Sequence, residues 1–251
     1  MRYMFADAPL FNSDLNGWNV AKVTTMRNLF DGATKFNGTI SDWDVSSVTE
    51  MYGMFIEASS FSQDISAWNV SSVTTFSDMF AGATSFDSPL NDWDVSSVTN
   101  MDSMFSVDQG ASSFSQDISA WNVSSVTNMR FLFSGASYFD SPLSDWDVSS
   151  VTDMTIMFYY APSFSQDISA WNVSSVTEMT SMFYGATSFD SDLNSWPISI
   201  SSAVSMSYMF YNATSFSGYL QDWQVGAVTY MNNMFSFATS FDSVLDAWDV
   251  R

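Results

Sequence analysis

A repeat of 25 residues recurs ten times along this chain, and few folds are compatible with it. The template is M-x-x-M-F-x-x-A-x-x-F-x-x-x-[IL]-x-x-W-x-V-x-x-V-T-x, seen without interruption at 51–75. The ten tryptophans share one template column, and seven of the nine intervals between them are 25 residues. All 17 methionines fall in the two Met columns. A fixed period of this length predicts a solenoid, in which stacked copies bury one continuous core.

The repeat also predicts the domain organisation. The copies begin at residues 1, 26, 51, 76, 101, 129, 154, 179, 206 and 231, which indicates a single solenoid domain over 1–251. Insertions near 107–110 and 197–203 lengthen the fifth and eighth copies. Insertions in repeat proteins map to surface loops, so we expect both segments to bulge from the stack.

Two segments of each copy have the pattern of regular structure. Trp68 and Val70 lie two residues apart, the spacing of one face of a strand, and the segment around them is rich in β-branched and aromatic residues. Met51, Met54 and Phe55 have the i, i+3, i+4 spacing of one helical face. The sequence therefore predicts a parallel β-sheet on one face and short helical turns on the other, with the preceding Ser and Thr residues as helix caps.

The motif S-F-x-Q-D-I-S-x-W-x-V-S-S-V-T-x-M-x-x-M-F, which starts at Ser60, resembles a known repeat. It is similar to the leucine-rich-repeat-like repeats of BspA-like surface proteins and of mycoplasma-type surface lipoproteins. The segment Ile65-x-x-Trp68-x-Val70 resembles the L-x-x-L-x-L strand signature of leucine-rich repeats. The resemblance covers essentially the whole chain. It implies a secreted or surface-anchored solenoid that acts in adhesion and protein binding and has no catalytic residues.

Composition excludes several classes of function. The net charge is -21, and residues 36–251 carry 24 acids against Arg130 and Arg251, a net of 2 - 24 = -22. Such a surface repels nucleic acid and acidic membranes, so we expect neither as a partner. The chain has no His and no Cys, and its carboxylates recur in equivalent columns, so we expect no enzyme activity and no cofactor. No run of 18 apolar residues predicts a transmembrane helix.

Acidic residues alternate between successive copies, which gives a 50-residue super-repeat. The column after Trp reads Asn69, Asp94, Asn122 and Asp147 in four successive copies. Two carboxylates one coil apart repel by about 1 kcal/mol in water, and doubling their separation halves this cost. The alternation therefore has two explanations, electrostatic relief and duplication of a two-copy unit. Weak candidates for metal ligands are Asp44, Asp94 and Asp147. If they bind Ca²⁺, the protein would form a surface array that Ca²⁺ stabilises, which is a minor alternative function.

Two further patterns bear on function. Five N-x-[ST] motifs mark potential glycosylation sites at Asn37, Asn69, Asn122, Asn172 and Asn212. The recurring S-V-T motif forms a Thr column, which gives an ice-binding solenoid as a minor alternative beside the helix-cap interpretation.

The end copies suggest how the protein is used. Both keep their core residues in register and have no polar cap, so an open core and an unpaired edge are expected at each end. We predict head-to-tail contacts that propagate into filaments, through Met1, Met4, Phe5, Trp18, Phe241, Trp248 and Val250. The chain's partners would be itself or other surface proteins and glycans. The sequence thus favours an extracellular or cell-surface structural and adhesive protein, with a protein- or glycan-recognition module that uses the strand face as the alternative.

Overall fold

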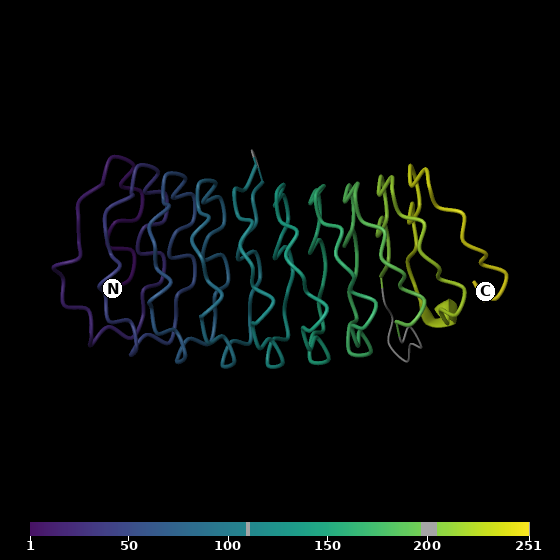
Figure 1. Ribbon diagram of the computed structural model, residues 1–251, viewed down its shortest axis with the longest axis horizontal. Coiled ribbons are helices and arrows are strands. Elements are labelled where there is room, and N and C mark those ends of the chain that lie inside the picture. The colour runs from purple at the N-terminus through teal and green to yellow at the C-terminus, as the bar shows by residue number, and fades with distance from the viewer. Residues whose placement is uncertain (109–110, 197–204, 251) are drawn as a thin grey trace.

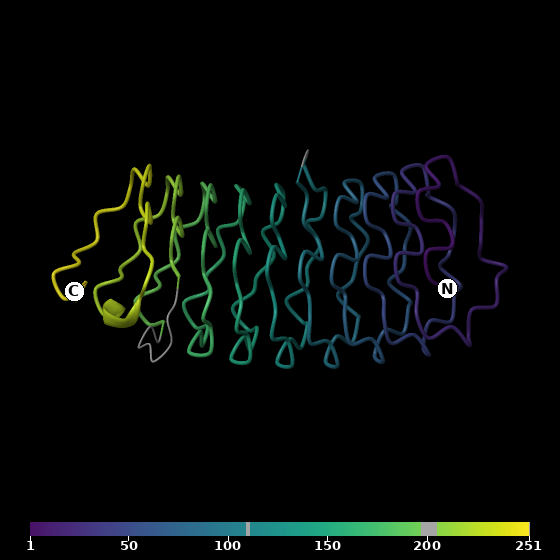
Figure 2. The same cartoon turned by 180° about the vertical axis from the view of Figure 1, so that it is seen from behind.

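The computed structural model is an elongated stack of coils with the two termini at opposite ends (Figure 1). It describes residues 1–108, 111–196 and 205–250. Coils 1 to 10 are named here by the ten repeat copies. The view from behind shows the same single row of coils (Figure 2). The chain is a repeat solenoid, as its period predicts.

Pairing between coils follows one narrow line along the stack. Isolated parallel bridges join the residue before the first Met column in successive coils, at Thr25, Glu50, Thr75, Asn100, Asn128, Asp153, Glu178, Ser205 and Tyr230. Among the described residues the one helical element is the 3-10 helix η1, Val225–Ala227, and no longer strand is formed.

The backbone beside this line alternates between two kinds of hydrogen bond. The N–H groups of Asn28 and Phe30 donate to carbonyl oxygens of the next coil, Tyr52 and Met54, at 2.9 Å each. The intervening N–H of Leu29 donates instead to Met26, three residues back, at 3.2 Å. Every second residue therefore bonds the next coil while its neighbours close tight turns.

These turns require left-handed backbone at fixed places. The third residue of the coil has a positive φ throughout, from 51° at Asn28 to 62° at Ile156. The seventh residue is also left-handed in most coils, and there Gly32, Gly82, Gly135 and Gly185 alternate with larger residues. Glycine adopts this conformation without steric cost, whereas other residues pay for it.

The expected helical turn and strand are not formed as predicted. Met51, Met54 and Phe55 are all fully buried, but the left-handed Gly53 between them breaks any helix. The expected strand at 65–70 is bent, because the N–H of Trp68 donates to the carbonyl oxygen of Ile65 at 3.1 Å. The sheet-like line of pairing therefore lies beside the Met columns instead.

The helix-cap role predicted for the Thr column is also wrong, because no helix follows this column in the part of the chain that the structure describes. The backbone N–H and the hydroxyl of Thr74 donate to the carbonyl oxygen of Thr49, at 3.0 and 3.2 Å. The same pair of hydrogen bonds to the preceding coil recurs at Thr49, Thr99, Thr127, Thr152 and Thr177.

The core consists of the predicted columns. Phe55 and Phe61 stack within a coil at 3.9 Å between ring centroids, and Phe55 stacks on Phe80 of the next coil at 5.6 Å. The indole N–H of Trp68 donates to the carbonyl oxygen of Ile40 in the preceding coil, at 3.1 Å. Fully burying each large side chain contributes about 1.5–3 kcal/mol, and the hydrogen bond satisfies its polar atom.

The structure locates one of the two insertions. At the first, Val107 is buried and Asp108 is exposed where the fifth coil lengthens. The segment at 197–203 and residues 109–110 lie outside the described residues.

Candidate interaction site at the end coils

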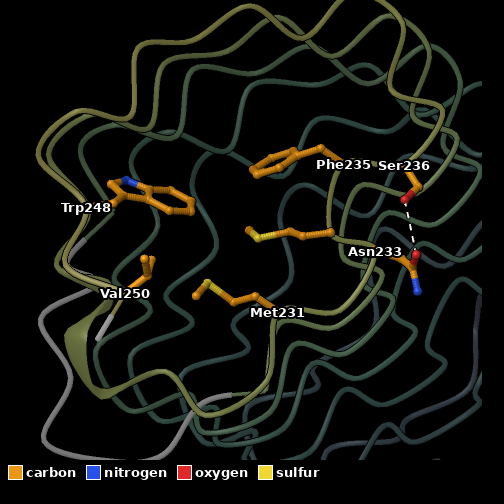
Figure 3. Close-up of a pocket in the computed structure, with 7 residues that line it drawn as sticks. Met231, Asn233, Phe235, Ser236, Trp248 and Val250 are labelled. Atoms are coloured by element: carbon orange, nitrogen blue, oxygen red, sulfur yellow. Dashed lines mark hydrogen bonds between the residues drawn. The ribbon is translucent and has the colours of Figure 1, made fainter.

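The last coil leaves an open apolar hollow of about 470 Å³ at one end of the stack. Figure 3 shows Met231, Phe235, Trp248 and Val250 around it, with a hydrogen bond of 3.3 Å between Ser236 and Asn233 at its edge. The equivalent Met, Phe and Trp residues of the interior coils are almost completely buried. The hollow is therefore the cross-section of the core, and Phe241 belongs to the same partly buried set.

The first coil exposes the opposite cross-section. Met4 is 52% exposed and Trp18 is 41% exposed, whereas their interior equivalents are buried. Phe5 is partly buried because it stacks on Phe11 at 4.0 Å and on Phe30 of the second coil at 5.5 Å. Each predicted end residue thus lies at its end coil, with Met1 also packed partly against the core.

The two ends carry complementary backbone groups. In the interior, N–H groups of one coil donate to carbonyl groups of the next, as Tyr208 does to Asn232 and Phe210 to Met234. The equivalent donors of coil 10, Asn233 and Phe235, have no following coil among the described residues. In interior coils these donors stand at template positions 3 and 5, and their acceptors stand at positions 2 and 4 of the next coil. The matching carbonyl oxygens of coil 1 belong to Arg2 and Met4.

The tryptophan column also leaves complementary groups at the two ends, but its N–H groups donate to the preceding coil instead of the following one. From Trp43 to Trp248, each indole N–H donates to a carbonyl oxygen of the preceding coil at 2.8–3.2 Å. Trp18 is the first of the column and has no preceding coil in the described chain. At the other end, the carbonyl of Leu245 stands in the column that accepts these bonds.

The predicted metal candidates lie apart, one in every second coil. Asp94 accepts hydrogen bonds from the hydroxyl and the backbone N–H of Ser96, at 2.6 and 3.1 Å, and these bonds lower the pKa of its carboxyl group. Ser46 and Ser149 do the same to Asp44 and Asp147, and lower those two pKa values. In 1–108, 111–196 and 205–250, no three acidic side chains form a group that could hold a metal ion.

The alternating Asn and Asp residues do not bond to each other in this column. Asn69 accepts from Ser71 of its own coil at 2.8–3.2 Å, just as Asp94 accepts from Ser96. Alternating bonds between coils occur elsewhere, where the N–H of Ser115 donates to Asp87 at 2.8 Å. The local role of both residue types is thus a turn closed by the side chain.

The predicted glycosylation sites differ in accessibility. Asn69, Asn122 and Asn172 are exposed, while Asn37 and Asn212 are half-buried. Asn37 also accepts hydrogen bonds from Ser62 and Gln63 of the next coil, each at 3.0 Å.

Sequence reasoning missed a face on which the residues vary. Template positions 2, 3, 6 and 7 lie beside the line of bridges and differ from coil to coil. At position 6 they place Tyr159, Tyr184 and Tyr211 in consecutive coils, with ring centroids 4.8 and 4.5 Å apart. Burial, together with a hydrogen bond to Tyr160, raises the pKa of Tyr184 to about 12. The departure of these positions from the monotony of the other exposed columns was the available signal.

Comparison with known proteins identifies the family. Segments 1–111, 106–204 and 198–251 match the family described as Mycoplasma protein of unknown function, DUF285. The chain belongs to this family. No curated protein matches it. Among the described residues, no helix has the length and apolar character needed to cross a membrane.

Solved structures give distant likenesses. A leucine rich cell surface protein from Faecalibacterium prausnitzii is 12% identical, with 95% of this chain and 74% of that one covered, at a TM-score of 0.36. A leucine-rich repeat protein from Bacteroides ovatus is 14% identical, with 79% of this chain and 64% of that one covered, at a TM-score of 0.27. A chain of the Toll–Spatzle complex of Drosophila is 12% identical, with 73% of this chain and 29% of that one covered, at a TM-score of 0.28.

Proposed function

We propose that this protein is a non-enzymatic structural and adhesive component of the cell surface whose solenoids join head to tail into filaments. The cell-surface placement rests on the likeness of its repeat to those of BspA-like surface proteins. The absence of His and Cys from the sequence supports a role without catalysis. The observation that carries the filament is the match between the unpaired groups of the first and last coils.

The interior ladder supplies the register of the proposed junction. Continuing it by one coil places the N–H of Phe235 on the carbonyl oxygen of Met4 in a second copy, as Phe210 pairs with Met234 inside the chain at 2.9 Å. The indole N–H of Trp18 in that copy then donates to Leu245. The junction would repeat an interior interface without changing any coil.

Apolar packing and charge both favour the same junction. The hollow of about 470 Å³ at coil 10 is the place that Met4, Phe5 and Trp18 of the second copy would fill. Residues 1–35 carry four basic residues against three acids, a net of 4 - 3 = +1, whereas the remainder is strongly acidic. The contact is heterologous, so it propagates into an open filament.

Sedimentation velocity at micromolar concentration, at low and high salt, tests the filament. We expect species larger than the 28.0 kDa chain that grow with concentration in both conditions, because salt screens charge but leaves apolar packing intact. Met4→Asp should abolish this growth, because it places an anion in the apolar junction. A monodisperse chain of 28.0 kDa in both conditions would falsify the filament.

A matched control and a rival occupant complete the design. Tyr138→Asp changes a side chain that is 62% exposed in coil 6, away from both ends, and should assemble like the wild type. Further coils of a longer polypeptide would satisfy the same end groups. If chains extended by one designed polar coil at each end stay monomeric while the unextended chain assembles, the second copy is supported.

The varied face supports a recognition module as a second candidate function. Positions 2, 3, 6 and 7 change from coil to coil, as expected of a surface that distinguishes one protein or glycan from another. This face lies beside the line of bridges and so takes the place of the expected strand face. Substituting Tyr208, which is exposed there, should weaken binding of the pure protein to a protein or glycan partner without affecting assembly.

A further inference from the structure

A pocket of about 230 Å³ opens on the varied face, at the first insertion. Coil 5 forms one wall, coil 6 the floor and coil 7 the opposite wall. Its lining residues are Val107, Asp108, Ser134, Gly135, Ser137, Tyr159 and Tyr160.

The pocket lies where a backbone carbonyl group, rather than a side chain, covers a glycine of the left-handed column. A Cβ added to Gly185 would come within 2.7 Å of the Tyr160 ring, so the preceding coil already fills the space above that glycine. Above Gly135 the preceding coil instead places the backbone carbonyl of Val107, and the chain then enters the insertion. A Cβ added to Gly135 would come within 2.2 Å of that carbonyl oxygen, so backbone covers the glycine and the pocket opens beside it.

The aromatic wall is held in place by its neighbours. Tyr159 and Tyr160 pack edge to face, with ring centroids 4.7 Å apart and an interplanar angle of 89°. Tyr184 packs against both, at 4.8 and 5.3 Å. Tyr160 nevertheless remains 47% exposed, so part of its ring is available to a ligand. The wall is preorganised, which lowers the entropic cost of binding.

The electrostatics select the sign of the ligand. Asp108 lines the wall of coil 5, and no basic side chain lines this pocket among the described residues. The nearest basic residue in sequence, Arg130, is paired with Asp153 at 3.6 Å. The strongly acidic surface of residues 36–251 also attracts cations over a longer range.

We propose that this pocket binds an organic cation, held between the tyrosine rings of coil 7 and the carboxylate of Asp108. Aromatic faces attract ammonium and guanidinium groups, and recognition of quaternary ammonium ligands by aromatic residues rests on this attraction. The group would come from a basic side chain of a partner or from a free quaternary ammonium compound. An inorganic Ca²⁺ ion fits less well, because it needs six to eight oxygen ligands and the lining offers one carboxylate.

Titration of the full chain with three probes, followed by calorimetry or NMR, tests this proposal. The probes are tetramethylammonium chloride, N-acetyl-arginine amide and the neutral methyl glucoside, each against a sodium chloride blank. We expect binding of at least one cation with a Kd on the order of millimolar, as for one exposed cation–π contact and one carboxylate. The cation that binds more tightly identifies the source, whereas tighter binding of methyl glucoside, or binding of no probe, overturns the proposal.

Two variants locate the site while preserving the fold. Tyr160→Gly removes the wall at a position with φ of 46°, where glycine is favoured, so the coil should remain folded. It should weaken cation binding about fivefold or more. Asp108→Asn keeps the shape of the pocket and should weaken binding about threefold or more at low ionic strength. Asp145→Asn, an exposed change beside Trp146 in coil 6, is the control. Equal affinities in all three variants would place any observed binding elsewhere and reject this site.

Discussion

The carboxyl group of Glu57 lies directly over Gly82 of the next coil, so that a Cβ added to Gly82 would come within 2.6 Å of the Glu57 Cδ atom. Tyr160 covers Gly185 in the same way, at 2.7 Å. A large residue in one coil therefore occupies the space left by glycine in the next. This relationship gives the alternation of glycine and larger residues at the seventh position a steric basis.

Glycine substitutions in this column should destabilise the fold in a defined order. Gly135→Ala should cost about 3 kcal/mol or more, because φ is 71° and the new Cβ would clash with the backbone carbonyl of Val107. Gly82→Ala should cost less, since the Glu57 side chain moves aside. Urea unfolding of Gly135→Ala, Gly82→Ala and the wild type measures the order of their free energies of unfolding.

Gly17→Ala is the matched control for this series. Nothing lies within 4 Å of a Cβ at Gly17, and the change should alter stability by less than about 1 kcal/mol. Equal losses for Gly135→Ala and Gly17→Ala would contradict the steric account.

The tryptophan column predicts a second difference between two chemically identical changes. The indole N–H of Trp121 donates to the buried Leu90 carbonyl oxygen at 2.8 Å. Trp121→Phe removes one of the two hydrogen bonds to that oxygen, which keeps the bond from the backbone N–H of Trp93 at 3.1 Å, and creates a cavity, so we expect a loss of about 2–4 kcal/mol. Trp18→Phe in dilute protein should cost less than about 1 kcal/mol, because no carbonyl group of the described residues accepts its indole N–H. Thermal unfolding that shifts equally in both variants would show that the bond contributes nothing.

The burial pattern was predictable from the sequence, but the backbone path was not. Met51, Met54, Phe55 and Trp68 are in the core, as their columns require. The i, i+3, i+4 spacing does not distinguish a helical turn from a turn with a left-handed third residue. Gly53 meets that requirement, but Asn28 and Ile156 meet it too, so residue type alone does not reveal it.

The candidate sites were predictable to different degrees. The exposed end residues follow from the repeat alone, because a column that continues to its last copy must end in an open face. The register of the junction depends on which N–H groups point to the next coil, and no side chain encodes this. The pocket over Gly135 arises from an insertion beside a glycine, two features that only the fold brings together.

Asp78 should make the fold less stable at neutral pH than an amide would. Burial is the main cause that raises the pKa of its carboxyl group, and the nearby Asp102 raises it further. A raised folded-state pKa means that the associated stability is present below the unfolded pKa of about 3.9 and is lost as pH rises through the folded value. Asp78→Asn should therefore unfold at higher urea than wild type at about pH 7, and the gain should vanish in acid.

Asp94→Asn should show the opposite sign. Hydrogen bonds from Ser96 lower the pKa of Asp94, so its contribution is present above the unfolded pKa and is lost as pH falls through the folded value. The variant should be slightly less stable than wild type near neutrality and should converge with it in acid. The same pH dependence in both variants would mean that general charge repulsion, rather than these local contacts, controls the response.

A serine that bridges two coils shows how the alternating copies bond to each other. The hydroxyl of Ser141 accepts the backbone N–H of the buried Ile118 at 3.1 Å and donates to Asp117 at 3.3 Å. Ser141→Ala leaves that N–H unsatisfied and should cost about 1–3 kcal/mol, whereas Ser125→Ala at an exposed site should stay within about 0.5 kcal/mol of wild type. Urea unfolding with and without about 1 M salt tests the source of this cost, because salt screens charge but leaves the buried bond to Ile118 in place. We expect the cost to persist in salt, and a cost that disappears in salt would contradict a stabilising hydrogen bond between these coils.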